Sequence, residues 1–449
     1  MPSAPLPPEL FDATGPDVTF DAMGVKMAVV GGGSTYTPEL VDGLCDYHSR
    51  LVVDELVLLD PDTDRLDAVG GVSERILRRR GWDGRVVTTQ DPLAAIDGAD
   101  FVVVQLRVGG QAARLSDETL PLHHGCFGQE TTGPGGLAKA LRTVPLVLEL
   151  AELTAARGAR DAWVVDFTNP VGIVTQALLD EGHRAVGLCN VARWVQRRLG
   201  HYLGGVEPDA ISLEHVGLNH LTWVRSASVG GVDRLPELIE RFGPELELES
   251  GTPIALIKLL GALPSYYLHY YYGRDAELEA QKAEGYRPRA AVVADLEAEL
   301  LAQYRDPRLD TKPEALAWRG GAYYSESAVR LMASLHAGSG DVQVVDVRND
   351  GAVPGLPDDA VVEVPARVDA EGAHPLPQRP LPPEMQGLVQ HCKAYERLAV
   401  QAAMSGSRDA VVRALVANPL VGQYPVAADL ADELLEANRR FLPRFFPAS

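Results

Sequence analysis

The sequence predicts an α/β protein whose first half is a doubly wound parallel sheet and whose second half mixes helices and strands. Three observations predict it: short apolar runs alternate with helical patterns from Lys26 to about residue 205, a glycine-rich turn follows the first run, and the alternation then stops. The 449 residues suffice for two or three structural units. We expect a leader at residues 1–25, a dinucleotide-binding domain at 26–205 and an α+β domain at 206–449.

The composition restricts the class of partner. The chain has 41 Lys and Arg against 62 Asp and Glu, and this net charge of −21 argues against nucleic acid or an anionic membrane. The four cysteines are scattered, so they form no disulfide framework. No apolar run approaches the ~18 residues that span a bilayer, and the Pro-rich residues 1–25 lack the apolar centre of a signal peptide. We therefore expect a cytoplasmic protein, and an anionic small ligand stays compatible.

The first predicted strand, 27–30, leads into a glycine-rich run at 31–38 and then into a predicted helix at 39–47. A strand, a glycine-rich turn and a helix N-terminus form a phosphate cradle, because glycines let the backbone approach a pyrophosphate and free N–H groups face it. The first two glycines of the dinucleotide fingerprint are present, although Tyr36 replaces the third. This predicts a Rossmann-like domain. The residues expected at the cofactor are Gly31, Gly33, Ser34 and Thr35.

The second predicted strand, 55–59, ends in Asp60. An acid at this place, about 20–30 residues past the glycines, holds the ribose hydroxyls of NAD in dinucleotide folds. The alternative is that Asp60 caps the helix expected from about Thr63. Because the acid disfavours a 2′-phosphate, NAD is preferred to NADP.

Polar residues follow later strands of the predicted sheet. The further predicted elements are helix 62–80, strand 86–89, helix 92–96, strand 101–106, a polar loop from 110 to 128, helix 137–156, strand 163–167, a helix ending at 180, a strand before 189 and a helix from 191. Arg107, Asn169 and Cys189 each come shortly after a strand. Open α/β sheets bind their ligands at these strand ends, so all three are candidate ligand-binding residues.

The pattern changes in the second half of the chain. The predicted elements there are strands 211–216, 221–229, 342–347 and 361–364, an aromatic helix at 264–272, a charged helix at 290–304, a Pro-rich loop at 375–383 and terminal helices at 385–403 and 426–441. Cys189 and His220 lie on either side of the change, and a thiol and an imidazole can together hold a metal ion. Taken alone, Cys189 is more simply a buried structural cysteine, since free cysteines are usually buried.

Six motifs occur in order along the chain. They are VGGGSTYTPEL at 30–40, QLRVGG at 105–110, QETTG at 129–133, TNP at 168–170, CNV at 189–191 and GLNH at 217–220. Together they resemble glycoside hydrolase family 4, and the resemblance covers nearly the whole chain from Lys26, including RGGAYYS at 319–325. The pair Cys189-Asn190 is similar to the 6-phospho-β-glucosidases, whereas the α-phosphoglucosidase branch carries Cys-Asp.

The resemblance implies a glycosidase that depends on NAD and a divalent metal, usually manganese, and hydrolyses a 6-phospho-β-glucoside. Its scheme is transient oxidation at sugar C3, removal of the C2 proton, elimination of the aglycone from C1, addition of water and return of the hydride, without net redox change. By motif, Cys189 and His220 are expected to bind the metal and Tyr267 to remove the proton. The residues expected to bind the substrate are Arg107, Asn169, Asn190 and Arg287.

Two of these roles have simple alternatives. Tyr267 lies among other tyrosines, where core packing is the alternative, and Arg287 has the alternative of a surface charge in a loop. The chain also departs from the family after Val191, where Ala192-Arg193-Trp194 replaces the usual Pro. Proline at a helix start is preorganising, so we expect metal binding to survive and substrate preference to be affected.

Three other functions stay open on the sequence. One is an NAD-dependent dehydrogenase of the lactate/malate type, whose architecture the family shares, although no Asp-x-x-Arg follows Asn190. The second is a catalytically silent NAD-binding sensor, and the third is a glycosidase of this family that acts on an unphosphorylated sugar. A homodimer or homotetramer is expected by analogy with such families.

Overall fold

The computed structural model describes residues 24–321 and 323–447. The predicted leader at residues 1–25 therefore lies almost entirely outside the described residues, and the first strand begins at Val25. In the described part, no helix is long and apolar enough to cross a membrane.

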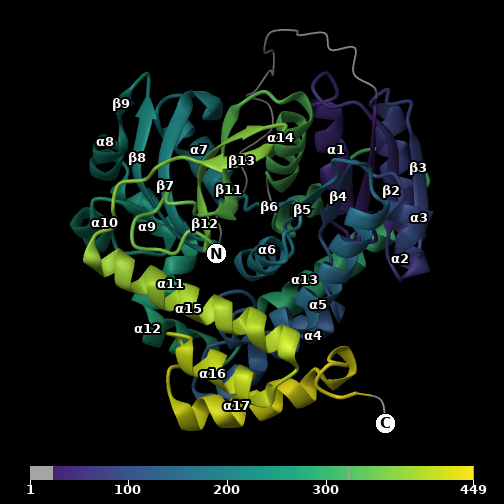
Figure 1. The fold of residues 1–449 in the computed structure, drawn as a ribbon. Coiled ribbons are helices and arrows are strands. Elements are labelled where there is room, and N and C mark those ends of the chain that lie inside the picture. Colours follow the sequence, from purple (N-terminus) through teal and green to yellow (C-terminus); the bar gives the residue numbers. More distant parts are fainter. Residues whose placement is uncertain (1–23, 322, 448–449) are drawn as a thin grey trace.

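The first half forms the predicted parallel sheet (Figure 1). Its strands pair in the order β3-β2-β1-β4-β5-β6, all in parallel. They are β1 (Val25–Val30), β2 (Val53–Leu59), β3 (Arg85–Thr89), β4 (Phe101–Val104), β5 (Trp163–Asp166) and β6 (Ala185–Gly187). The order reverses between β1 and β4, and the crevice beyond such a reversal is where doubly wound sheets bind ligands.

Helices cover both faces of this sheet, which confirms the doubly wound α/β prediction. They are α1 (Thr37–Asp46), α2 (Thr63–Arg79), α3 (Pro92–Ile96), α5 (Pro134–Arg157), α6 (Val171–Asp180) and α7 (Val191–Tyr202). Successive strand residues face opposite cores: Met27 and Val29 pack in one apolar cluster, and Ala28 and Val30 pack in the other. Burial on both faces explains why these strands are continuous apolar runs.

The predicted polar loop at 110–128 is wrong. Residues Gly110–Thr119 form helix α4, and Leu120–His124 form the short 3-10 helix η2. The buried charges of this helix are paired: Asp117 is fully buried and accepts a 2.9 Å hydrogen bond from Arg142 on α5. Partners such as Arg142 lie far from α4 in the sequence and could not be read from it. The charged residues of this segment therefore led to the prediction of a loop.

The strands of the second half continue the same sheet. They are β7 (Ile211–Leu218), β8 (Leu221–Val229), β9 (Val232–Asp233), β10 (Leu263–Pro264), β11 (Asp341–Arg348), β12 (Val361–Asp369) and β13 (Gly372–Pro375). The hairpin β11–β12 joins the halves through one backbone pair on each side, Asp346 with Gly187 and Glu363 with Gly217. The sheet thus continues across the expected boundary at 205–206, and a division into domains there stays a prediction.

The second half of the chain also contains further helices, several of which pack against the first half, such as α13 on α2 and α4, and α14 on α1 (Figure 1). They are α8 (Leu235–Arg241), α9 (Gly243–Ser250), α10 (Ile254–Leu260), α11 (His269–Tyr272), α12 (Arg274–Lys282), α13 (Arg289–Tyr304), α14 (Tyr324–Ala337), α15 (Pro383–Ser405), α16 (Arg408–Ala417) and α17 (Tyr424–Ala437). Helix α15 runs beneath both halves, and α16 and α17 lie below it. The predicted aromatic helix at 264–272 is broken into the strand β10, a 3-10 turn at Tyr266–Leu268 and the single turn α11.

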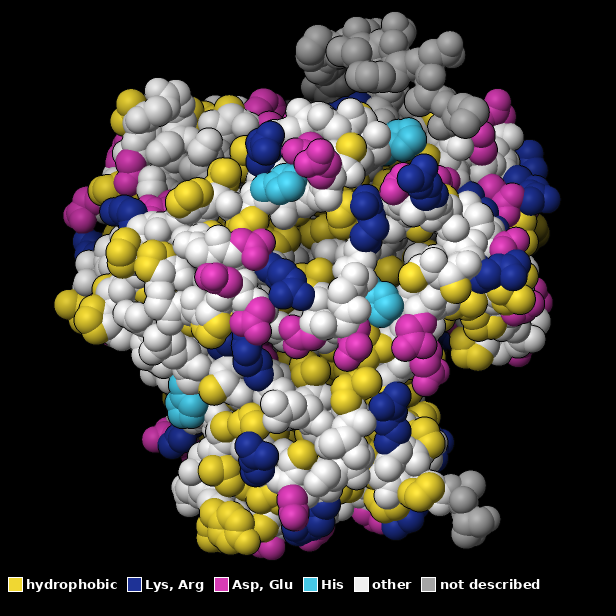
Figure 2. Space-filling model, in the orientation of Figure 1, with side chains coloured by type: hydrophobic (Ala, Val, Ile, Leu, Met, Phe, Trp, Pro, Cys, Tyr) yellow, Lys and Arg dark blue, Asp and Glu magenta, His cyan; other side chains and the backbone are white. Residues whose placement is uncertain are grey.

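Charges of both signs are interspersed over the surface. Figure 2 shows acidic and basic side chains mixed across the face in view, rather than separated into large areas of one sign.

Candidate active site

The glycine-rich turn after β1 has the geometry of a dinucleotide cradle. Gly31 adopts a φ of 84°, and a Cβ there would lie 2.8 Å from the Cα of Leu106, which follows β4. Only glycine therefore fits between the two strand ends at the reversal of strand order. Ser34 and Thr35 complete the turn just before helix α1, where the N–H of Thr37 donates to the carbonyl oxygen of Ser34 at 3.0 Å and that of Glu39 to the carbonyl oxygen of Tyr36 at 2.9 Å.

Asp60 closes this turn from the neighbouring strand end. Its carboxylate accepts hydrogen bonds from the backbone N–H of Gly33 at 3.2 Å and of Asp62 at 3.0 Å. The cap of helix α2 is a different residue, Asp62, which accepts from the N–H of Arg65 at 3.0 Å. The alternative that Asp60 is the helix cap is therefore wrong, and its place beside Gly33 is the one expected of a ribose-binding acid.

Arginine 319 is a contact of the turn that sequence reasoning missed. Its Nε donates to the hydroxyl of Thr35 at 2.6 Å, its Nη2 donates to Ser34 at 3.2 Å, and the guanidinium pairs with Glu297 at 3.1 Å. The signal was present, since Arg319 begins the RGGAYYS motif. The second half of the chain therefore reaches the cofactor turn of the first half.

Cys189, His220 and Tyr267 come together at the other end of the same sheet edge. Cys189 follows β6, His220 lies in the tight turn between β7 and β8, and the rings of His220 and Tyr267 stack with centroids 3.5 Å apart. Burial, and next the proximity of Cys189, raise the pKa of Tyr267. The fold thus assembles three residues that are separated by up to 78 positions in the sequence.

The donor set of this cluster fits a divalent cation. Burial lowers the pKa of His220 to about 3, so its imidazole is neutral, as a metal ligand must be. Its Nδ1 atom is buried and has no hydrogen-bond partner among the described residues. Burial and the charge of Glu363 raise the pKa of the Cys189 thiol, so a thiolate there requires a cation beside it. Cys189 is thus poorly suited to be a free nucleophile.

The backbone of His220 is held in an unusual conformation by buried acids. Its φ is 62°, in the left-handed region that costs a non-glycine residue about 1–2 kcal/mol. Glu363, 1% exposed, accepts a 2.9 Å hydrogen bond from Asn219, and its second oxygen lies 2.8 Å from Nε2 of His215. These bonds fix the end of β7 immediately before His220.

Asn169 and Asn190 lie at the strand ends between the cofactor turn and the cluster. Asn169 precedes a cis peptide bond to Pro170, and its Oδ1 is buried without a hydrogen-bond partner in the described part of the chain. Asn190 is the N-cap residue of α7, and its Oδ1 lies 3.8 Å from Sγ of Cys189. A buried amide oxygen without a partner is ready to accept a hydrogen bond from a ligand hydroxyl.

A buried charge cluster surrounds Glu130, another residue whose role sequence reasoning missed. Glu130 pairs with Arg107, with Arg114 at 3.1 Å and with Lys139 at 2.9 Å. Burial alone would raise the pKa of Glu130, but these three cations hold it well below the usual range. Burial and the charge of Arg107 lower the pKa of Lys139 to about 7. The QETTG motif marked Glu130 in the sequence, but its partners could not be read from it.

Arg287 is the expected site residue that the structure does not bring to this cluster. Its side chain is 60% exposed and pairs with Asp295 at 2.6 Å. Arg289, two residues on, is held against the backbone of Trp318 at 2.8 Å, and Arg114 and Glu130 both influence its pKa. The arginine of this segment that faces the charge cluster is therefore Arg289.

In the departure from the family pattern at 192–194, Arg193 is held by acids of other segments. Arg193 is 8% exposed and pairs with Glu326 on α14 and with Asp209 at 2.7 Å. It also lines a cavity of about 650 Å³ beside Cys189. The guanidinium of Arg193 is paired with both acids, and its pair with Glu326 joins α7 to α14.

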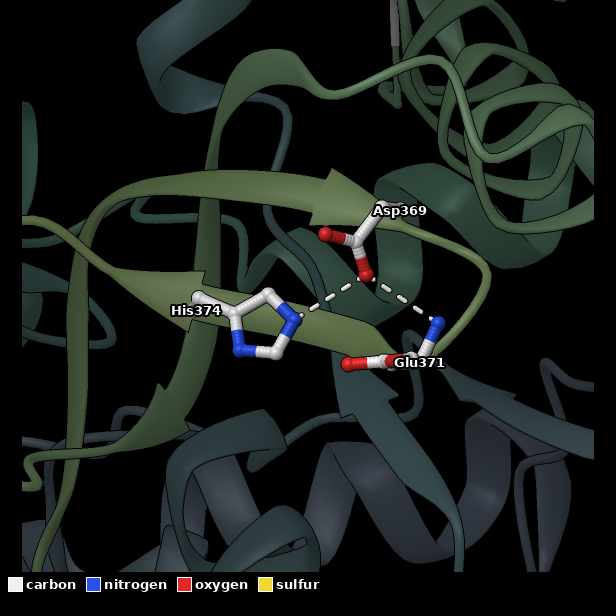
Figure 3. Close-up of side chains that lie close together, drawn as sticks. All are labelled: Asp369, Glu371 and His374. Atoms are coloured by element: carbon white, nitrogen blue, oxygen red, sulfur yellow. Dashed lines mark hydrogen bonds and ion pairs between the residues drawn. The ribbon is translucent and has the colours of Figure 1, made fainter.

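A second group of metal-ligand types lies on the hairpin β12–β13. Asp369, Glu371 and His374 place their ligand atoms within 4.8 Å of one another (Figure 3), and Nε2 of His374 lies 3.0 Å from Asp369. Arg367 also pairs with Asp369 at 3.6 Å. Because Asp369 already pairs with His374 and Arg367, we assign no ion to this group.

The fold and this site define a class: a dinucleotide-binding α/β enzyme with a thiol–imidazole pair suited to a metal. Residues 26–204 match the model of the Family 4 glycosyl hydrolases, and residues 215–421 match that of the Family 4 glycosyl hydrolase C-terminal domain. The chain belongs to glycoside hydrolase family 4 and is a glycosidase.

Two relatives give the resemblance detail. The chain is 39% identical to a probable 6-phospho-beta-glucosidase of Bacillus subtilis, over 94% of this chain and 98% of the relative. It is also similar to the crystal structure of the 6-phospho-beta glucosidase of Thermotoga maritima with manganese, NAD+ and glucose-6-phosphate. The identity there is 32%, the TM-score is 0.86, and 93% of this chain and 99% of the other are covered.

A more distant likeness concerns the fold alone. A lactate dehydrogenase from a deep-sea metagenome aligns with a TM-score of 0.53 at 15% identity, over 85% of this chain and 99% of that one. The expected lactate dehydrogenase-like architecture is thereby confirmed, and this likeness says nothing about activity.

Proposed function

We propose that this protein hydrolyses 6-phospho-β-glucosides with the help of NAD and a divalent metal ion, manganese being the expected one. The observation that carries the proposal is the meeting of Cys189, His220 and Tyr267 at the sheet edge that also carries the dinucleotide turn, in a chain of this family. The names of the Bacillus subtilis and Thermotoga maritima relatives support the substrate class, and the Thermotoga maritima complex supports both cofactors.

Cys189 and His220 would hold the metal, which when bound supplies Lewis-acid polarisation of the sugar oxygens. The Gly31–Thr35 turn and Asp60 would hold NAD, which supplies the hydride acceptor. The proposed course is transient oxidation at C3, loss of the C2 proton, elimination of the aglycone from C1, addition of water and reduction at C3. Atoms and electrons then balance to hydrolysis without net redox change.

Tyr267 is the proposed acceptor of the C2 proton. Burial, and next the charge of Cys189, raise the pKa of its hydroxyl, so it becomes a base near neutral pH only where a cation offsets those effects. Its ring is fixed against His220, and Arg114 is a nearby positive charge that lowers its pKa. The hydroxyl of Tyr267 is thus positioned by the same residue that would bind the metal.

Arginines near Glu130 are suited to the 6-phosphate. Arg107 and Arg289 both lie at the charge cluster, and the planar donor fork of arginine matches phosphate oxygens. Arg287, which the motif indicated, is two residues from Arg289, and its exposed position favours Arg289 for this role. Asn169 and Asn190 would bind sugar hydroxyls beside the metal ligands.

A panel of chromogenic glucosides tests the proposal. The purified protein is given 4-nitrophenyl β-glucoside with and without the 6-phosphate, and each substrate is assayed with and without NAD, with Mn²⁺ and with a chelator. We expect release of nitrophenol from the phosphorylated substrate only when both cofactors are present, without accumulation of NADH absorbance. Faster cleavage of the unphosphorylated glucoside would contradict the substrate class, and steady NADH accumulation would indicate a dehydrogenase.

A further inference from the structure

Tyr324 stands at the centre of the proposed site, although none of the expected roles includes it. It is the first residue of helix α14, and its hydroxyl lies 3.9 Å from Sγ of Cys189. Its ring stacks on Phe167 after β5, with centroids 5.6 Å apart at 26°, and meets Tyr36 of the dinucleotide turn edge-on at 6.3 Å. One ring therefore contacts residues that follow three different strands of the parallel sheet.

The dinucleotide turn fixes this ring through the backbone of its neighbours. The hydroxyl of Tyr36 donates to the carbonyl oxygen of Gly321 at 2.9 Å and accepts from the N–H of Ser325 at 3.0 Å. The hydroxyl of Ser325 also donates to Glu39 on α1 at 3.4 Å. These bonds fix the backbone at Tyr324, and the packing of its ring on Phe167 and Tyr36 restrains the side chain, so the hydroxyl is held beside Cys189.

The chemistry of a metal-bound cysteine decides the direction of the contact. A thiolate sulfur has no proton and can only accept, whereas a tyrosine hydroxyl can donate. We propose that Tyr324 is a positioning residue: its hydroxyl donates a hydrogen bond to the Cys189 sulfur and holds that sulfur towards the metal. The inference rests on the metal site of the proposed function.

Such a bond has effects on the metal that a packing role does not have. A hydrogen bond to a ligand atom orients that ligand and withdraws electron density from it, and loss of such a partner typically costs ~10–100-fold in metal affinity. Removal of the bond also raises the energy of the sulfur lone pairs. In a cobalt-substituted protein, the sulfur-to-cobalt charge-transfer band then moves to lower energy.

The test compares Tyr324→Phe with Tyr323→Phe. The first removes only the hydroxyl that faces Cys189. The matched control removes the hydroxyl of the adjacent tyrosine, whose ring lies under Arg197 at 4.7 Å. Binding of Co²⁺ and Mn²⁺ to the whole protein is titrated, and NADH fluorescence measures cofactor binding. For Tyr324→Phe we expect a band at lower energy and at least ~10-fold weaker Mn²⁺ binding, with NADH binding unchanged; Tyr323→Phe should match the wild type.

Three results would overturn the inference. A Tyr324→Phe protein with the wild-type band and wild-type Mn²⁺ affinity refutes the hydrogen bond while it leaves the proposed function intact. An equal shift in Tyr323→Phe shows a general disturbance of α14 instead of a specific bond. Absence of any sulfur-to-cobalt band in the wild type removes Cys189 from the metal, and then the metal site of the proposed function fails together with the inference.

Discussion

The two ends of the active-site edge differ in how their polar groups are satisfied. In the dinucleotide turn, the N–H of Gly33 donates a hydrogen bond to Asp60, and the N–H of Tyr36 donates one to Ser34. The hydroxyl of Thr37 donates to the carbonyl oxygen of Gly32 at 2.9 Å. In the metal pocket, Nδ1 of His220 and Oδ1 of Asn169 are buried without hydrogen-bond partners among the residues described. The turn is therefore complete by itself, whereas the pocket is built to be completed by ligands.

The largest effect that separates the two ends should come from Cys189→Ser. A hydroxyl is a much weaker ligand than a thiolate for a divalent transition metal, so we expect Mn²⁺ binding to weaken by more than ~100-fold and turnover to be lost. NADH binding, measured by fluorescence, should stay within about twofold because the turn does not depend on the pocket. Unchanged Mn²⁺ affinity would remove Cys189 from the ligand set.

The charge cluster of the pocket should be nearly as sensitive. Glu130→Gln leaves Arg107, Arg114 and Lys139 without their shared acid in the interior, and loss of one partner of a buried ion pair costs about 3–5 kcal/mol. We expect the free energy of unfolding, measured in urea, to fall by about that amount. The control is Glu436→Gln at the exposed pair with Arg439, where no measurable change is expected because solvent screens the pair. Equal effects in both variants would contradict the buried cluster.

Asp60→Ala should have a smaller effect, and it should weaken cofactor binding instead of metal binding. Loss of the proposed bonds to the ribose hydroxyls should weaken NADH binding by about 10-fold, the factor for ~1.4 kcal/mol, and should reduce the preference over NADPH. Mn²⁺ binding should be unaffected. The matched control, Asp62→Ala, removes the cap of α2 and should lower stability by about 1 kcal/mol without changing NADH affinity. An equal loss of NADH affinity in both variants would show that Asp60 affects the conformation of the turn and does not bind the ribose directly.

The smallest effect should be on the pH dependence of stability, through the carboxyl of Asp166 at the end of β5. Burial raises the pKa of Asp166 to about 8, against the opposing effect of hydrogen bonds from Thr168 and Thr175. The folded protein therefore keeps a proton there between about pH 4 and pH 8 that the unfolded chain has released, so stability falls as pH rises through this range. Asp166→Asn should remove roughly 2–4 °C of the fall in Tm between pH 5 and pH 8. The same pH dependence in both proteins would show that Asp166 is not its source.

The sequence predicted the cofactor end far better than the pocket. Strands β1 and β2 and the turn between β1 and α1 are local features, in which apolar runs, glycines and Asp60 lie within about 35 residues, so their period and spacing carry the information. The helix α4 was missed because its buried charges are neutralised by partners such as Arg142, and these are invisible in a local window.

The pocket depends on contacts between segments far apart in the chain. Cys189, His220 and Tyr267 were reached through family motifs, because spacing alone did not distinguish them from core residues. Glu130, Arg319 and Tyr324 lay inside quoted motifs without a role, since their functions depend on pairing with Lys139, Thr35 and Cys189. Arg287 was expected from the family motif and its role stays a prediction, because local sequence does not show that its side chain is exposed and pairs with Asp295.

The two halves of the sheet are joined to the hairpin β11–β12 by one backbone pair on each side. Gly187, Asp346, Glu363 and Gly217 form one row across the junction. Cys189 lies two residues beyond one end of this row, and His220 lies three residues beyond the other. An ion held by both residues would therefore bridge the narrowest part of the sheet, and by mass action it would oppose separation of the halves. The metal would then serve as a cross-link of the tertiary structure as well as a participant in the chemistry.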